Sequence, residues 1–296
     1  MDSKVFKIVT DRFLDLFKDG IIPWEQPWVA IHGEDRLHAW KHHNGKPYSL
    51  LNQMLLPKPG EYITANQAFK EGGSIRKGAK PCYIFEYFVD KREAEKPSDD
   101  GEPTPTPEEE KPEKMSFRYY KVFHFDDVEG LSPRYEAKPM PAPRPLPERI
   151  ANAEKVLWDY LIASGVSIDF KEDEQPRYEP ADDVVILPKE EQFKSKEYMY
   201  ATAFHELTHS TGSPDRLKRF GIEGVPLRDR ALEELTAEIG SAALLLLLGI
   251  ENDKTKRNNQ AYIQSWAEAL EKDPKLIVRA SSRAKKAVAL ILGEEA

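Results

Sequence analysis

Residues 196–212, KEYMYATAFHELTHSTG, contain the pattern that decides the interpretation of this chain. No Pro or Gly interrupts the run from Lys196 to Ser210, so it is predicted to form a helix, and Gly212 lets the chain turn after it. His205 and His209 are four residues apart, which places both imidazoles on one face of the helix, one turn apart. Two neutral imidazoles in this arrangement can bind one Zn²⁺ ion and leave positions for a third protein ligand and a water molecule.

Carboxylates before and after the second histidine complete the predicted metal site. Glu206 follows the first histidine and is expected to act as the general base for the water. We place the third ligand at Glu234, on a second predicted helix. Glu238 lies one turn later on the same face, where it can accept the outer N–H of a ligand histidine. Glu233 points about 100° away from Glu234 and is expected to face solvent or to cap the helix.

Two further features are candidates for substrate contact. Tyr178, Tyr198 and Tyr200 can donate to an oxyanion or can simply pack, and Tyr198 is preferred because it shares the helix face of His205. The segment VVILP at residues 184–188 is predicted to be a strand, either an edge strand that binds a substrate backbone or an ordinary buried core strand. For the metal site itself, two alternatives stay open: a structural or vestigial site, and no site at all.

Composition and charge restrict the class of protein. A length of 296 residues with 40% hydrophobic and 32% charged residues indicates a globular protein of two domains. Cys82 is the only cysteine, which excludes an internal disulfide and a secreted disulfide scaffold. The N-terminus lacks the apolar core of a signal peptide, and the longest apolar run, 242–248, is far shorter than the roughly 20 residues that span a bilayer. We therefore expect a cytoplasmic protein without a membrane partner.

The net charge of -8 argues against nucleic-acid binding by the bulk of the surface. The negative charge is unevenly distributed, however, because residues 91–114 hold nine acidic residues against five basic ones. The segment 91–116 is rich in Pro and Glu and is predicted to be disordered. The residues before it are close to neutral, so a local basic face in the N-terminal half is compatible with the composition.

The order of the predicted elements gives an α+β fold in two domains. Residues 1–131 form a mixed α/β domain, the Pro-rich residues 132–147 a linker, and residues 148–296 a mostly helical domain. The two strands that flank the acidic segment are expected to pair, with that segment as an overlong hairpin tip. Helices are predicted at 4–19, 64–72, 148–163, 196–210, 231–248, 258–271 and 280–292, and strands at 81–89, 117–128 and 184–187.

The N-terminal half contains one group of residues suited to nucleic acid. Arg76, Lys77 and Lys80 lie in a glycine-flanked basic turn that can hold phosphates. The aromatic residues nearby in sequence can stack on unpaired bases, and the candidates are Trp24, Trp28, Trp40 and Tyr48. The alternative is that the tryptophans anchor a core and the basic turn is simply solvated.

The chain resembles a known family, the ArdC-type antirestriction proteins, which are also related to the N-terminal part of TraC-type plasmid primases. The resemblance extends over nearly the whole length, with matching order and spacing. In the first half it rests on TDRFLDLFKDGIIPWEQPW, NGKPYSLLN, ITANQAFKEGGSIRKGAK and YYKVFHFDDVEGL. In the second half it rests on FHELTHSTGSPDRLKR, ALEELTAEIGSAALL, NNQAYIQSWAEAL and ASSRAKKA.

The resemblance implies an N-terminal domain that binds single-stranded DNA and a C-terminal zincin-like metallopeptidase domain. It implies metal ligation by His205, His209 and Glu234, with Glu206 as the catalytic glutamate. It further implies a role on conjugative plasmids or related mobile elements, protecting incoming DNA from host restriction. The chain departs from the family at Arg230-Ala231-Leu232, where an aromatic-Ala-aromatic run is usual, and in its longer acidic insertion, which would repel DNA near a binding groove.

Three functions remain open at this point. The first is an antirestriction protein in which DNA binding delivers a zinc peptidase to a protein target. The second is a DNA-binding protein whose metal domain is structural, and the third is a peptidase without a DNA role. The sequence names neither the protein or peptide substrate nor the oligomeric state.

Overall fold

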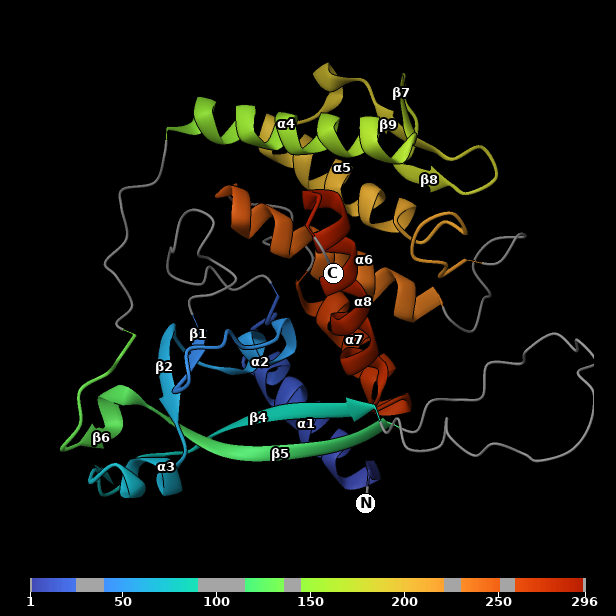
Figure 1. Cartoon of the computed structure of the whole chain (residues 1–296). Helices are drawn as coiled ribbons and strands as arrows, with labels where there is room; N and C mark the ends of the chain where they lie inside the picture. Colours follow the sequence, from blue (N-terminus) through green and yellow to red (C-terminus); the bar gives the residue numbers. More distant parts are fainter. Residues whose placement is uncertain are drawn as a thin grey trace, which may run out of the picture.

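A computed structural model describes residues 2–24, 40–89, 115–135, 145–220, 230–250 and 259–294 of the chain. Figure 1 shows the N-terminal strands and short helices at one end of the molecule and the second sheet at the other, with the last helices of the chain between them. Trp28, nearly all of the acidic insertion and most of the predicted linker lie outside the described residues.

Four strands form the N-terminal sheet in the order β1-β2-β5-β4. The two longest pair antiparallel, from Cys82 opposite Val122 to Val89 opposite Met115, which confirms the predicted pairing across the acidic insertion. The other two were missed because three or four residues are too few for an alternating pattern to be visible. The strands are β1 (Trp40–His42), β2 (Gly60–Ile63), β4 (Cys82–Val89) and β5 (Met115–His124).

Local capping explains where the N-terminal helices begin. The long first helix is α1 (Asp2–Lys18), close to its predicted bounds. In α2 (Leu50–Leu55), the Ser49 side chain accepts from the Asn52 N–H. In α3 (Ala65–Lys70), Thr64 and Gln67 form a reciprocal capping box, which fixes the helix start within the predicted range 64–72. A turn of 3₁₀ helix at Phe125–Asp127 leads into β6 (Val128–Glu129). Strand β6 pairs antiparallel with β3 (Ser74–Ile75) in a small two-stranded ladder.

The second half consists of five helices and a three-stranded sheet within the described residues. The sheet order is β7-β9-β8, with β7 parallel and β8 antiparallel to the central strand. Of the two alternatives for VVILP, the edge strand is wrong and the buried core strand is confirmed: it is the central strand β9 (Val184–Pro188), and three of its residues are buried. The other elements are β7 (Ser167–Lys171), β8 (Arg177–Glu179), α4 (Leu146–Ser164), α5 (Lys196–Ser210), α6 (Arg230–Leu248), α7 (Asn259–Lys272) and α8 (Leu276–Leu292).

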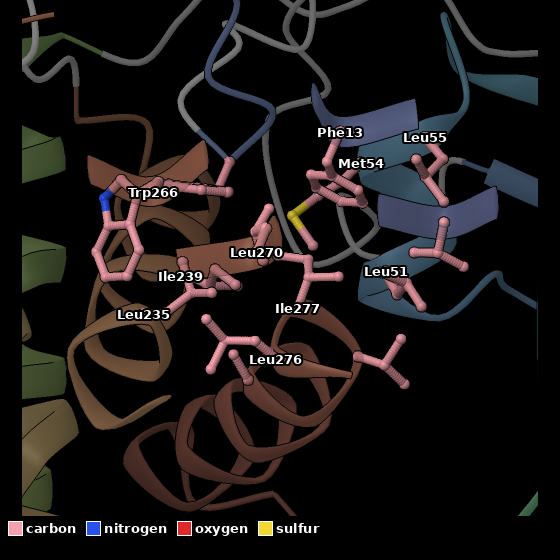
Figure 2. Packing of buried hydrophobic residues seen from close by; sticks show 14 of the residues in the cluster. Phe13, Leu51, Met54, Leu55, Leu235, Ile239, Trp266, Leu270, Leu276 and Ile277 are labelled. Carbon is pink, nitrogen blue, oxygen red and sulfur yellow. The ribbon is translucent and has the colours of Figure 1, made fainter. Parts of the chain in front are cut away.

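One hydrophobic core is shared by the two halves of the chain. Figure 2 shows Phe13 of α1 and Met54 of α2 together with residues from three C-terminal helices. The C-terminal contributors labelled there are Leu235 and Ile239 of α6, Trp266 and Leu270 of α7, and Leu276 and Ile277 of α8. Each large side chain buried in this way contributes about 1.5–3 kcal/mol of transfer free energy. The N-terminal helices thus support α6, the helix on which the third metal ligand was predicted.

A second core lies within the C-terminal half, and α6 belongs to it as well. Ala243, Leu244 and Leu245 pack with buried residues of α4, β9, α5 and α8. Gly240 allows α6 to approach α5 closely, because a Cβ atom at this position would lie 2.7 Å from the Thr208 Cγ2 atom. The Ser241 hydroxyl also donates to the Ala201 carbonyl of α5 at 3.0 Å. Among the described helices, none has the length and apolar character needed to cross a membrane.

Candidate metal centre

Helix α5 presents two imidazoles on one face. Its N-terminus is capped by Ser195, whose hydroxyl accepts from the Tyr198 N–H, and its interior contains no helix-breaking residue. His205 and His209 follow one another by one turn, and their Nε2 atoms lie 3.2 Å apart. Both side chains are mostly buried, with exposed fractions of 14% and 13%. The two rings therefore converge on a single point, as the spacing predicted.

Helix α6 brings a carboxylate to the same point. The Oε2 atom of Glu234 lies 3.7 Å from His205 Nε2 and 3.8 Å from His209 Nε2. Ligand atoms of a tetrahedral zinc site with bonds near 2.05 Å are separated by about 3.3 Å, so this donor set fits such an ion with small adjustments. His205 lowers the pKa of Glu234 more than desolvation raises it, so the carboxylate form that a metal requires is favoured.

The outer nitrogens of both histidines face carboxylates of α6. Glu238 lies at the predicted place, with its Oε1 atom 3.6 Å from His205 Nδ1. Glu233 contradicts its prediction: it is buried rather than solvent-facing, and its Oε1 atom lies 3.2 Å from His209 Nδ1. Burial would raise the pKa of Glu233, but hydrogen bonds with Arg219 and His209 outweigh it and lower the pKa to about 2. Glu233 is buried because the loop that follows α5 covers this face of α6, and Arg219 in that loop pairs with its carboxylate.

A cleft of about 420 Å³ opens beside the convergent ligands. Glu206 lines it and is 7% exposed, so its side chain is largely buried at the cleft wall. One wall is the edge strand β8, which contributes Arg177 and Tyr178. Arg230 lines the cleft as well. The remaining lining residues are Pro176, Pro180, His205, His209, Phe220, Glu233 and Glu234.

Of the three candidate tyrosines, Tyr178 lines the cleft, whereas Tyr198 and Tyr200 are not among its lining residues. Tyr198 is not among the described residues that line the cleft, and its ring packs 6.2 Å from the ring of Phe193. Tyr178 lines the cleft, but its hydroxyl donates to Asp183 at 2.7 Å. Tyr200 is buried in the C-terminal core. The preference for Tyr198 rested on helix periodicity alone, and two turns of helix separate it from the ligands.

The residues predicted to bind DNA divide into buried and exposed groups. Trp24 is 5% exposed and packs edge-on against Phe17 and Trp266, with ring centroids 5.8 and 6.3 Å away. Tyr48 is 3% exposed and packs against Tyr62. A base-stacking role for these two residues is therefore wrong, and the alternative of core anchors holds. Trp28 lies outside the described residues.

Exposed basic and aromatic side chains lie next to one another elsewhere in this half. Arg76, Lys77 and Lys80 are exposed, and Arg76 lies 3.6 Å from the Glu129 carboxylate. Tyr83 follows on β4 and is 36% exposed. Tyr119 on β5 is 42% exposed, and their ring centroids are 6.0 Å apart. Lys121 lies over the Tyr83 ring at 5.9 Å. Sequence reasoning overlooked these strand residues, although Tyr83 and Lys121 pair directly in the register of the predicted hairpin.

Comparison with known families matches the two halves of the chain to two different family models. Residues 3–123 match the model described as the N-terminal domain of anti-restriction factor ArdC. Residues 155–283 match the model described as zincin-like metallopeptidase. The second range contains His205, His209 and Glu234.

Relatives cover nearly the whole chain. Two DNA primases TraC of Escherichia coli are 32% identical over 296 and 303 residues, covering 95% and 97% of this chain. The chain spans 19% and 27% of the lengths of these two primases. Two crystal structures of the antirestriction ArdC protein from the R388 plasmid align with 97% of the chain. The Mn(II)-bound structure has a TM-score of 0.67 and 29% sequence identity, and this chain covers 97% of it. The metal-free structure has a TM-score of 0.65 and 28% sequence identity, and this chain covers 96% of it.

Proposed function

Since the chain belongs to the ArdC-type antirestriction proteins, we propose that it is a zinc-dependent peptidase that binds single-stranded DNA and protects the incoming DNA of a mobile element from restriction. One observation supports the peptidase part above all others. Ligand atoms of His205, His209 and Glu234 lie within 4.8 Å of one another, at a cleft that Glu206 also lines. Two imidazoles and one carboxylate, with room for water, are the donor set of a catalytic rather than a closed structural zinc site.

We expect zinc to be the metal in cells, although an ArdC structure contains Mn(II). A site of nitrogen and oxygen ligands binds Zn²⁺ more tightly than Mn²⁺, and imidazole ligands suit zinc. Zinc bound here would lower the pKa of a water molecule towards neutrality and polarise the carbonyl of a peptide bond.

The chain's own residues supply the remaining steps of peptide hydrolysis. The Glu206 carboxylate takes a proton from the attacking water and delivers it to the leaving amine nitrogen. The edge strand β8 can pair with an extended peptide on its side away from β9, which would hold the substrate along the cleft wall. Arg230 is exposed in the same cleft, and we expect its guanidinium to take over oxyanion stabilisation from the tyrosines.

Metal content tests the site directly. Protein purified without chelator should contain about one zinc ion per chain by elemental mass spectrometry, and Glu234→Ala should lose most of it. Glu271→Ala, on an exposed position of α7 outside the cleft, is the matched control and should keep its zinc. Wild-type protein without bound metal would contradict the proposed site.

The catalytic role needs a separate experiment. Glu206→Gln should keep its zinc but lose protection of unmodified DNA transferred into a restricting host. Full protection by this zinc-loaded variant would favour the second candidate, a DNA-binding protein whose metal domain is structural. In that case, Arg76, Lys77 and Lys80 would matter for protection while Glu206 would not.

The DNA-binding part is supported by the exposed group of Tyr83, Tyr119 and Lys121 beside the basic turn. Aromatic side chains stack on unpaired bases of any sequence, and basic side chains neutralise the phosphates between them. Lys80 is three residues from Tyr83, so phosphate and base contacts can belong to one strand of DNA.

Binding to labelled oligothymidine at low salt tests this part. Tyr83→Ala with Tyr119→Ala should weaken binding by at least tenfold, because stacking contributes about 1–3 kcal/mol per base. Trp158→Ala is the matched control, since Trp158 on α4 is an aromatic residue 49% exposed on the other half of the chain. If wild-type protein does not bind at low salt, the third candidate remains, a peptidase without a DNA role.

A further inference from the structure

We propose that Glu233 is a positioning residue of the metal centre. Held by Arg219, its carboxylate accepts the Nδ1 hydrogen of His209 and leaves the Nε2 lone pair directed at the metal position. This inference rests on the proposed metal site. It adds Glu233 to that site, although helix periodicity predicted that its side chain faces solvent.

The contact between Glu233 and His209 determines which ring nitrogen carries the proton. The Oε1 atom of Glu233 lies 3.2 Å from His209 Nδ1. Because an ionised carboxylate only accepts hydrogen bonds, the contact requires a hydrogen on Nδ1. In the neutral ring, Nε2 is then unprotonated, and it is the atom 3.8 Å from the Glu234 carboxylate at the metal position.

Arg219 prevents the Glu233 carboxylate from turning away. Its Nη2 donates to Oε1 at 2.7 Å and its Nε to Oε2 at 2.9 Å, a two-point pairing. Both side chains are 4% exposed, so solvent does not compete for this pair. The carboxylate is therefore fixed in position and orientation by a planar partner.

Arg219 is itself attached to the end of the helix that carries His209. It donates to the Thr208 carbonyl at 2.7 Å and to the Thr211 hydroxyl at 2.8 Å. The contacts form a closed path from α5 through Arg219 to Glu233 on α6 and back to His209 on α5. Such a path keeps the imidazole oriented without a bound ion, since no member can rotate without breaking a hydrogen bond of its neighbour.

The contact between Glu238 and the other ligand histidine has a different geometry. Glu238 is 30% exposed, and its Oε1 atom lies 3.6 Å from His205 Nδ1, beyond direct hydrogen-bond distance. The two carboxylates therefore differ in burial and distance: Glu233 is buried at hydrogen-bond distance from its histidine, whereas Glu238 is more exposed and lies farther from His205. This difference provides a matched control on the same helix.

The tautomer of His209 is the decisive measurement, and it needs no substrate. Nitrogen-15 NMR of the histidine rings in the metal-free, full-length protein should find His209 protonated at Nδ1. In Glu233→Gln, whose amide can donate to Nδ1, the proton should move to Nε2, and zinc affinity measured by chelator competition should fall about 10- to 100-fold. Glu238→Gln should leave the His209 tautomer unchanged.

A second variant covers the case in which Glu233→Gln does not fold because Arg219 is left unpaired. Arg219→Met combined with Glu233→Met removes both charges at similar volume, and it should fold while losing the His209 preference for Nδ1–H. A wild-type His209 protonated at Nε2 would overturn the inference, as would a variant pair with unchanged tautomer and zinc affinity. Wild-type protein that binds no zinc would instead contradict the proposed function, and the tautomer would still decide the role of Glu233.

Discussion

Gly240 of α6 lies against Thr208 of α5, so closely that a Cβ atom at residue 240 would meet the Thr208 Cγ2 atom at 2.7 Å and the Oγ1 atom at 3.1 Å. Thr208 lies between the two ligand histidines in sequence and is fully buried. Its hydroxyl already donates to the Phe204 carbonyl at 2.7 Å, so the side chain cannot simply rotate away. The distance between the two ligand helices is therefore set at this contact.

Replacing Gly240 by alanine should separate the helices and weaken the metal site. We expect Gly240→Ala to lower the free energy of unfolding by about 1–3 kcal/mol, the usual range for overpacking a core. Zinc affinity should fall as well, because Glu234 moves with α6. Urea unfolding of the metal-free protein and chelator competition measure the two effects.

A compensating variant tests the stated cause. Thr208→Ser removes the Cγ2 atom that the new methyl group would meet and keeps the hydroxyl. Combined with Gly240→Ala, it should restore most of the stability, and alanine itself favours the helix by about 0.5–1 kcal/mol over glycine. A double variant as unstable as Gly240→Ala alone would contradict the steric explanation.

The shared core predicts that the N-terminal helix stabilises the metal centre. Phe13 of α1 is fully buried with Leu235 and Ile239 of α6. Phe13→Ala should lower the free energy of unfolding by about 3–5 kcal/mol and should also reduce zinc retention, although residue 13 is far from the ligands in sequence. Phe69→Ala is the matched control, since Phe69 is 81% exposed and its loss should change neither quantity. Unchanged zinc retention in folded Phe13→Ala would show that the two halves are energetically independent.

The site residues whose relative positions could be predicted from the sequence are those placed by helix geometry. His205, His209, Glu234 and Glu238 lie within two regular helices, where spacing determines the face on which a side chain lies. Glu233 could not be assigned in this way, because its environment comes from Arg219 in a loop between the helices. Helix periodicity predicts the face on which a side chain lies, but it does not predict which loop covers that face.

The sequence was also insufficient to predict which aromatic side chains of the N-terminal half are buried and which are exposed. Trp24, Tyr48 and Tyr83 are all aromatic residues of the N-terminal half, yet the first two are core residues and the third is exposed. Trp24 is covered by residues of α1 and α7, and Tyr48 packs against Tyr62 of β2, a strand too short to be recognised from a two-residue alternation. The long β4–β5 hairpin was predicted correctly because both strands are rich in β-formers.

His42 predicts a pH dependence of stability. Burial, with a smaller effect of Lys46, lowers the pKa of His42 from 6.5 to about 4. The unfolded chain therefore binds this proton more readily, so the stabilising contribution is complete above pH 6.5 and is lost as the pH falls through about 4. The loss amounts to at most about 3 kcal/mol.

Urea unfolding of the metal-free protein at several pH values measures this effect without interference from metal release. His42→Phe keeps an aromatic ring beside Tyr48, whose ring centroid lies 3.7 Å from that of His42. Burial also lowers the pKa of His124, so the wild type and the variant should both lose stability on acidification, and the variant should lose less. Equal slopes between pH 6.5 and 4 would contradict the assignment to His42.

The salt dependence of DNA binding separates phosphate contacts from base contacts. If Lys77 and Lys80 neutralise phosphates, each change to Gln should lower the slope of log affinity against log salt by about 0.7 for a single strand. Lys285→Gln, on an exposed position of α8, should leave the slope unchanged. Tyr83→Ala should weaken binding at every salt concentration without changing the slope, because stacking releases no counterions. A slope lowered equally by Lys285→Gln would indicate diffuse attraction to the whole surface rather than a site along β4 and its preceding turn.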